Sequence, residues 1–200
     1  KATLDFKSAA PANGSATFTI KAQNSNNAEA FVETKGNISK RTTFTNSVAW
    51  NVGSWDSETI YQTPDLATLV ENVVGNGSWC GGNSLAFIIS GSSDALHRVW
   101  SYDGDPSAAP QLNVEFEPTE SNNGGCINQN YFGKMTHQDD DAEETSIGDV
   151  YVTTENHTLD LGTDDDGNSR TVGIRFRDVP IRKDATIVSA HLILHAQPGD

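Results

Sequence analysis

Short strand-like segments separated by turn residues make up most of the sequence, and this pattern constrains the fold more than any other feature. Residues 17–22 and 111–116 alternate polar and apolar side chains, as expected for strands with one buried face. Residues 85–89 form a continuous apolar run, which is typical of a strand covered on both faces. Residues 171–176 and 185–196 are two further strand candidates. The sequence therefore predicts an all-β fold.

One segment has the period of a helix instead. Thr63 suits the N-cap position, Pro64 suits the first helical position, and Asp65 complements the helix dipole. An apolar stripe with helical spacing follows, formed by Leu66, Leu69, Val70, Val73 and Val74. Gly75 and Gly77 end this pattern. We therefore expect an antiparallel β-sandwich with one short packed helix at about residues 63–75.

The net charge of −14, from 13 Lys and Arg against 27 Asp and Glu, limits the partners of such a fold. Nucleic acids and anionic membranes require clustered basic residues, and no apolar run approaches the roughly 18 residues of a membrane span. We expect neither nucleic-acid binding nor membrane insertion. Eleven acids and no Lys or Arg lie between Asp139 and Asp166, interrupted by Val150 and Leu159 at strand-like spacing. We therefore expect these acids on ordered loops, where a bound cation relieves carboxylate repulsion.

Two cysteines, Cys80 and Cys126, lie far apart and fit no metal-binding pattern. A disulfide between them is one interpretation, and it fits the low-lysine composition of a secreted protein. The alternative is two unpaired thiols in a cytosolic protein. We favour the disulfide and expect an extracellular or cell-surface location. Lys1 opens directly into strand-like sequence, so we expect a mature or excised segment.

A series of motifs in the last third of the chain resembles a known family. The motifs are residues 139–144 (DDDAEE), 159–162 (LDLG), 172–176 (VGIRF), 179–181 (VPI), 185–187 (ATI) and 189–192 (SAHL). Together they resemble the opening strands of DNRLRE-type jelly-roll domains, which are classed among carbohydrate-binding modules. The resemblance implies a jelly-roll-like sandwich, and it implies fold more than function because these motifs serve packing and turns.

The closing half of the same family pattern is also recognisable, but it lies earlier in the chain. Five segments resemble this closing half: residues 50–55, 63–66, 83–87, 101–104 and 109–114. The resemblance therefore implies permuted halves: residues 1–117 are a C-terminal-type part, residues 118–138 are a linker with Cys126, and residues 139–200 are N-terminal-type strands. We expect the last part to complete a neighbouring copy or a tandem repeat by strand complementation.

Candidate metal ligands follow from the acidic segments, because Ca²⁺ prefers oxygen donors. They are Asp141, Glu143, Asp103, Asp160, Asp164 and Asp166. Residues 164–168 cluster oxygen donors around Gly167 but lack the Glu of a full EF-hand loop. By the resemblance, Asp141, Glu143 and Asp103 meet in space and hold a structural Ca²⁺, with the three residues contributed by neighbouring copies if the halves are permuted. The alternative is a set of solvated acidic loops.

Two tryptophans in Gly/Ser-rich turns, Trp55 and Trp79, are candidates for a sugar-stacking platform. The alternative is that they belong to the core, with Trp79 covering the disulfide at Cys80. No nucleophile elbow, phosphate loop or haem-attachment motif occurs, so we expect no enzyme activity.

The sequence thus predicts a non-catalytic, calcium-stabilised extracellular β-sandwich. We expect it to act as a structural unit of a surface filament, stalk or tandem adhesin, with further copies of itself as partners. The alternative is a polysaccharide-binding module of a larger secreted enzyme or adhesin. Exposed, coplanar Trp55 and Trp79 side chains favour that alternative.

Overall fold

The fold is described from a computed structural model for residues 12, 14–56, 59–79, 81–93, 96–117, 130–152, 158–181 and 183–195. The strands are β1 (Ala16–Ala22), β2 (Val48–Val52), β3 (Ile60–Gln62), β4 (Asn83–Ser93), β5 (His97–Trp100), β6 (Gln111–Glu117), β7 (Asn130–Lys134), β8 (Asp141–Thr145), β9 (Val150–Tyr151), β10 (Thr158–Leu161), β11 (Arg170–Val179) and β12 (Thr186–His195). A helix, α1 (Ala67–Val74), and a 3₁₀ turn, η1 (Gln138–Asp140), complete the described elements.

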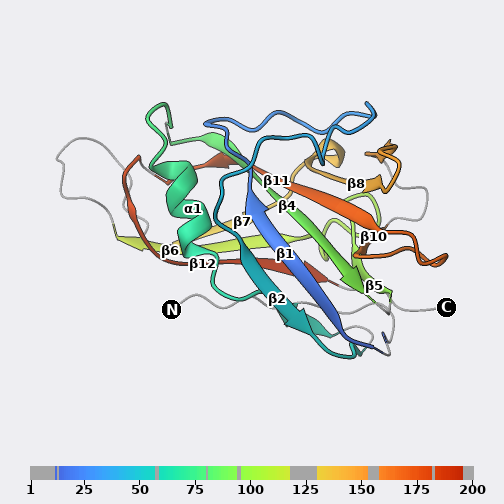
Figure 1. The fold of residues 1–200 in the computed structure, drawn as a ribbon. Coiled ribbons are helices and arrows are strands. Elements are labelled where there is room, and N and C mark those ends of the chain that lie inside the picture. Colours follow the sequence, from blue (N-terminus) through green and yellow to red (C-terminus); the bar gives the residue numbers. More distant parts are fainter. Residues whose placement is uncertain are drawn as a thin grey trace.

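The strands form two main antiparallel sheets and one short pair. The larger sheet has six strands in the order β2-β1-β4-β11-β8-β9, and the second has four in the order β3-β12-β6-β7. Strands β10 and β5 pair with each other. Figure 1 shows β1, β4 and β11 side by side, with α1 at the opposite end of the molecule from β5 and β10. The predicted all-β sandwich with one short helix is confirmed.

The core lies between the two main sheets, and alternation along each strand decides which side chains enter it. Phe87 of β4 meets Phe176 of β11 with ring centroids 6.5 Å apart. Leu192 and Leu194 of β12 are fully buried in the same core cluster. Burial of side chains of this size contributes about 1.5–3 kcal/mol each, so this core is the main source of stability.

A second, smaller cluster covers the outer face of the six-stranded sheet. It contains Phe31 and Ile38 from the loop between β1 and β2, packed with Ala86 and Ile88 of β4. Leu85, Phe87 and Ile89 of the same strand enter the main core. The prediction that residues 85–89 are covered on both faces is therefore confirmed.

The helix is shorter than the predicted 63–75 because its expected start has another role. The Thr63 hydroxyl accepts the Leu192 N–H at 3.3 Å, and the Asp65 carboxylate accepts the Ala190 N–H at 2.9 Å. These bonds hold the 63–65 segment along the edge of β12, so the helix begins at Ala67. Its apolar stripe is buried as expected: Leu66, Leu69, Val70, Val73 and Val74 are at most 1% exposed.

Strands from both predicted parts of the chain share every sheet. From residues 139–200, β11 pairs with β4, β10 pairs with β5, and β12 pairs with β6, all within one chain. The end of the expected 118–138 linker forms β7, which pairs with β6, and the start of η1. Completion of a neighbouring copy by residues 139–200 stays a prediction. None of the described helices is long and apolar enough to cross a membrane.

Candidate functional site: the acidic strand β8 and its neighbours

The acidic stretch that begins at Asp139 forms η1 and β8, beside β11 in the six-stranded sheet. Four of its carboxylates are almost fully buried: Asp140 is 0%, Asp141 1%, Glu143 8% and Glu144 3% exposed. The expectation that these acids lie on loops is wrong for residues 141–145, which form a strand. A buried carboxylate is stable only with hydrogen-bond donors or positive charges nearby, or as the protonated acid.

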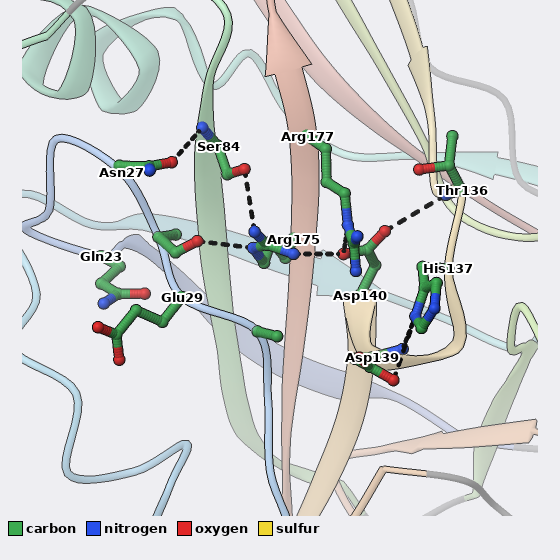
Figure 2. Close-up of polar contacts among 12 residues, drawn as sticks. Gln23, Asn27, Glu29, Ser84, Thr136, His137, Asp139, Asp140, Arg175 and Arg177 are labelled. Carbon is green, nitrogen blue, oxygen red and sulfur yellow. Dashed lines mark hydrogen bonds and ion pairs between the residues drawn. The ribbon is translucent and has the colours of Figure 1, made fainter.

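Asp140 is held by two arginines of β11 (Figure 2). Its Oδ1 accepts hydrogen bonds from Arg175 Nη1 at 2.8 Å and from Arg177 Nε at 2.7 Å. The Arg175 guanidinium also donates to the Ala28 carbonyl at 2.6 Å and to the Ser84 hydroxyl at 3.1 Å. This ion cluster therefore ties η1, β11, β4 and the loop after β1 together.

Glu144 is held by backbone donors instead. Its Oε2 accepts the N–H groups of Ile38 and Ser39, each at 2.8 Å, and its Oε1 accepts the Ser39 hydroxyl. Hydrogen bonds to a charged acceptor are the stronger kind, so three of them offset much of the cost of burial. Glu144 thereby fixes the loop that covers the outer face of the sheet.

Asp141 has fewer donors. Its Oδ2 accepts the Tyr102 N–H at 2.9 Å, whereas its Oδ1 is buried without a hydrogen-bond partner. Burial raises the pKa of Asp141 to about 8; the bond from Tyr102 opposes this rise, and the nearby charges of Asp103 and Asp140 add to it. Asp103 therefore lies near enough to Asp141 in the same chain for its charge to act on that carboxylate.

Glu143 faces the same side of β8 as Asp141 but meets different groups. One carboxylate oxygen accepts the Asp160 N–H at 3.0 Å. Burial raises the pKa of Glu143 to about 7. The hydrogen bond from the Asp160 N–H acts to lower this pKa, and the charge of Asp160 acts to raise it. Burial also raises the pKa of Asp160, although Arg98, whose Nε lies 2.9 Å from Asp160 Oδ1, acts against it.

The remaining two candidate ligands, Asp164 and Asp166, lie on the turn before β11. Asp164 accepts backbone N–H bonds from Asp166 at 3.0 Å and Asn168 at 2.8 Å, and it pairs with Arg170 at 2.9 Å. Desolvation acts to raise the pKa of Asp164, but the bonds from Asn168 and the charge of Arg170 outweigh it and the pKa is lowered. Asp164 is therefore committed to closing this turn.

The six expected ligands thus do not converge on one point. Asp141 lies with Asp103, Glu143 lies with Asp160, and Asp164 closes its own turn with Asp166. In the described part of the chain, no three His, Cys, Asp or Glu side chains are grouped so that they can hold a metal ion. The pair of Asp141 and Asp103 is the best fit, because Asp141 Oδ1 is an orphaned buried acceptor.

Both candidate sugar-stacking tryptophans are buried. Trp55 is 2% exposed, stacked on Tyr61 at 4.7 Å and edge-on to His97. Trp79 is 1% exposed, and its indole N–H donates to the Ile181 carbonyl at 2.8 Å. Sugar stacking needs an exposed aromatic face. The predicted platform is therefore not formed by these residues, which serve the core.

The residues that organise this region, Asp140, Glu144, Arg175 and Arg177, were not among the predicted site residues. Arg175 and Arg177 are spaced two residues apart on either side of an apolar residue in a strand, which indicates carboxylate partners on one face, and this pattern was available in the sequence. The predicted disulfide of Cys80 and Cys126 lies outside the described residues. No protein family, no characterised protein and no solved structure matches the chain.

Proposed function

We propose that this chain is a non-catalytic structural β-sandwich, a unit of an extracellular filament, stalk or tandem adhesin that assembles with further copies of itself. The observation that carries the proposal is Phe132, which is 72% exposed on β7. Within the described residues, β7 is an edge strand of the four-stranded sheet. Edge strands are templates for pairing with another chain, and an exposed aromatic residue there favours association.

The build of β7 directs Phe132 outward. Tyr131 packs against the core, and its ring lies across Gly133, where a Cβ atom would collide with it. Burial raises the pKa of Tyr131 to about 12, so its phenol stays neutral. With the inner side of the strand anchored in this way, Phe132 is available to a second copy that pairs along β7.

The buried charges support a structural role over a catalytic one. Asp140 is fully buried and engaged by two arginines that fasten elements together, whereas catalytic carboxylates face a cleft that substrate can enter. The alternative of a polysaccharide-binding module loses its support with the burial of Trp55 and Trp79.

We also propose that Ca²⁺ stabilises this unit at Asp141 and Asp103. Asp141 Oδ1 is buried without a partner, and the two carboxylates repel each other. A cation bound between them would remove that repulsion. Ca²⁺ takes six to eight oxygen ligands, so backbone carbonyls and water would complete its coordination.

The assembly proposal is tested by electron microscopy and sedimentation velocity of the intact chain. We expect polymers with one copy per repeat, and we expect Phe132→Ser to shift them to monomers. Val188→Ser is the matched control, because Val188 is 41% exposed on another strand of the same sheet. A monomeric wild-type chain, or equal effects of both variants, would contradict the proposal.

The calcium proposal is tested by thermal unfolding with excess Ca²⁺ and with EDTA. We expect Ca²⁺ to raise the Tm of the wild-type chain, because a ligand that binds only the native state stabilises it. The rise should disappear in Asp141→Asn and persist in Asp166→Asn, whose side chain lies on the separate turn before β11. An identical Tm in both buffers would exclude the ion.

A further inference from the structure

A cavity of about 260 Å³ opens beside Glu144, between two turns of the chain. One wall is residues 34–41, named here the lysine turn, and the other is the hairpin that joins β8 to β9. The lining residues are Lys35, Gly36, Ser39, Lys40, Glu144, Ser146, Ile147 and Gly148. None of them belongs to the candidate calcium site or to the β7 edge.

The side chains of the two lysines in this cavity pack against the backbone of two glycines. Gly36 has φ 77°, and a Cβ atom there would lie 2.6 Å from Lys40 Cε, so the Lys40 stem rests on the glycine backbone. Gly148 has φ 90°, and a Cβ atom there would lie 3.3 Å from Lys35 Cγ. Only glycine adopts such φ values at low cost while leaving this room. The two lysine stems are therefore packed against the walls.

Hydrogen bonds hold the two walls together. The Gly36 N–H donates to the Gly148 carbonyl at 2.7 Å. Glu144 accepts the Ile38 and Ser39 N–H groups from the opposite turn. The cavity is therefore built by bonds between the turns, so little ordering is needed when a ligand enters.

The charges in the cavity favour an anion. Both oxygens of Glu144 already accept hydrogen bonds from Ile38 and Ser39, so this carboxylate is engaged by the lysine turn on the opposite wall. Lys35 has only a long, exposed contact of 3.9 Å with Asp149, and such surface pairs contribute little. Among the described residues, the Lys40 ammonium has no carboxylate partner. Ile147, which is 67% exposed, adds an apolar surface at the rim.

We propose that this cavity binds a small organic carboxylate. The Lys40 ammonium, assisted by Lys35, contacts the carboxylate, and the Ser146 hydroxyl hydrogen-bonds to it. The Ile147 side chain contacts the carbon chain of the ligand. The volume admits a carboxylate of a few carbons, either as a free metabolite or as an acidic side chain of a second copy.

The test is an NMR titration of amide resonances with sodium acetate and sodium butyrate, against sodium chloride at equal ionic strength. We expect saturable shifts at Gly36, Ser146 and Gly148, with butyrate binding about threefold tighter than acetate. Lys40→Met keeps the stem over Gly36 and should weaken binding about tenfold. Lys183→Met, which changes a lysine in the turn between β11 and β12, should leave binding unchanged. Non-saturable shifts, or equal weakening by both variants, would overturn the proposal.

Two further measurements sharpen the result. Ile147→Ser should abolish the preference for butyrate while acetate binding persists, and a preference that survives this change would contradict the assigned role of Ile147.

Sedimentation velocity identifies the source of the carboxylate. Self-association that both acetate and Lys40→Met disperse assigns it to a second copy, whereas association that neither affects leaves the free ligand as its source.

Discussion

The two faces of strand β8 bury carboxylates in different ways. Glu144, on the outer face, accepts three hydrogen bonds, and Asp140, just before the strand, binds two arginines. Asp141 and Glu143, on the inner face, each accept one backbone N–H from elsewhere in the chain. Burial raises the pKa values of Asp141 and Glu143, to about 8 and about 7.

The two faces therefore differ in how many donors offset the cost of burying a carboxylate. All four side chains are at most 8% exposed, so desolvation acts on both faces. On the outer face, Asp140 and Glu144 hold neighbouring segments together through ion pairs and hydrogen bonds to their carboxylates. On the inner face, the acids are held close to protonation and are available to a cation.

Substitution of Arg175 should have the largest effect on stability, because Arg175 forms one of the two ion pairs of the buried Asp140. Arg175→Met leaves Asp140 buried with one arginine and frees the Ala28 carbonyl and the Ser84 hydroxyl. We expect a loss of about 3–5 kcal/mol in the free energy of unfolding, measured by urea denaturation.

The double variant Asp140→Asn with Arg175→Met is the control for this prediction. It removes the buried charge together with its partner, so it should recover part of the lost stability. Lys183→Ala, which breaks an exposed pair with Asp184, should cost at most about 0.5 kcal/mol. A loss for Arg175→Met no larger than that for Lys183→Ala would show that the ion pair of Arg175 with Asp140 is not needed for stability.

The difference between the two faces also limits what the sequence predicts. The double cover of residues 85–89 and the buried stripe of α1 follow from local periodicity, which the sequence displays. The fate of the acids depends on distant partners: Arg175 lies 35 residues from Asp140, and Ile38 lies 106 residues from Glu144. A charge run therefore looks like a solvated loop until the tertiary contacts are known.

The same limit explains the errors at the tryptophans and at the helix start. Trp55 and Trp79 lie in turn-like sequence, but rings of this size fill the core when the fold brings a partner such as Tyr61 or the Ile181 carbonyl. Thr63 and Asp65 have the residue types of helix caps, and both accept N–H groups of β12, while Asp65 also accepts the Ala67 N–H at 3.0 Å. At the tryptophans and at Thr63, a tertiary contact outweighs a local preference.

The two acids on the inner face, Asp141 and Glu143, make the free energy of unfolding depend on pH. Because the pKa of Asp141 is raised from 3.8 to about 8, the folded chain keeps a proton that the unfolded chain releases above about pH 4. This contribution to stability is full below pH 4 and is lost as the pH rises through 8. In EDTA, we expect this contribution of Asp141 to fall by about 2–3 kcal/mol between pH 6 and pH 8.5, and the raised pKa of Glu143 adds to the fall in the free energy of unfolding.

Asp141→Asn isolates that pH effect. Asparagine keeps an acceptor for the Tyr102 N–H and cannot ionise, so the variant should be more stable than the wild type at pH 8.5 and should show a weaker pH dependence. Urea denaturation at pH 6, 7 and 8.5 measures both quantities. A slope identical to that of the wild type would mean that Asp141 does not titrate in this range.

The sharpest comparison changes one acid on each face by the same amount. Glu144→Gln removes the charge that the Ile38 and Ser39 N–H groups stabilise, so it should cost about 2 kcal/mol at pH 7.5. Glu143→Gln keeps an acceptor for the Asp160 N–H and removes a charge that burial disfavours, so it should add about 1 kcal/mol. The two substitutions are chemically identical and lie one residue apart, so opposite signs in urea denaturation can only reflect the donors on each face. Equal signs would mean that the surroundings of β8 do not distinguish its two faces.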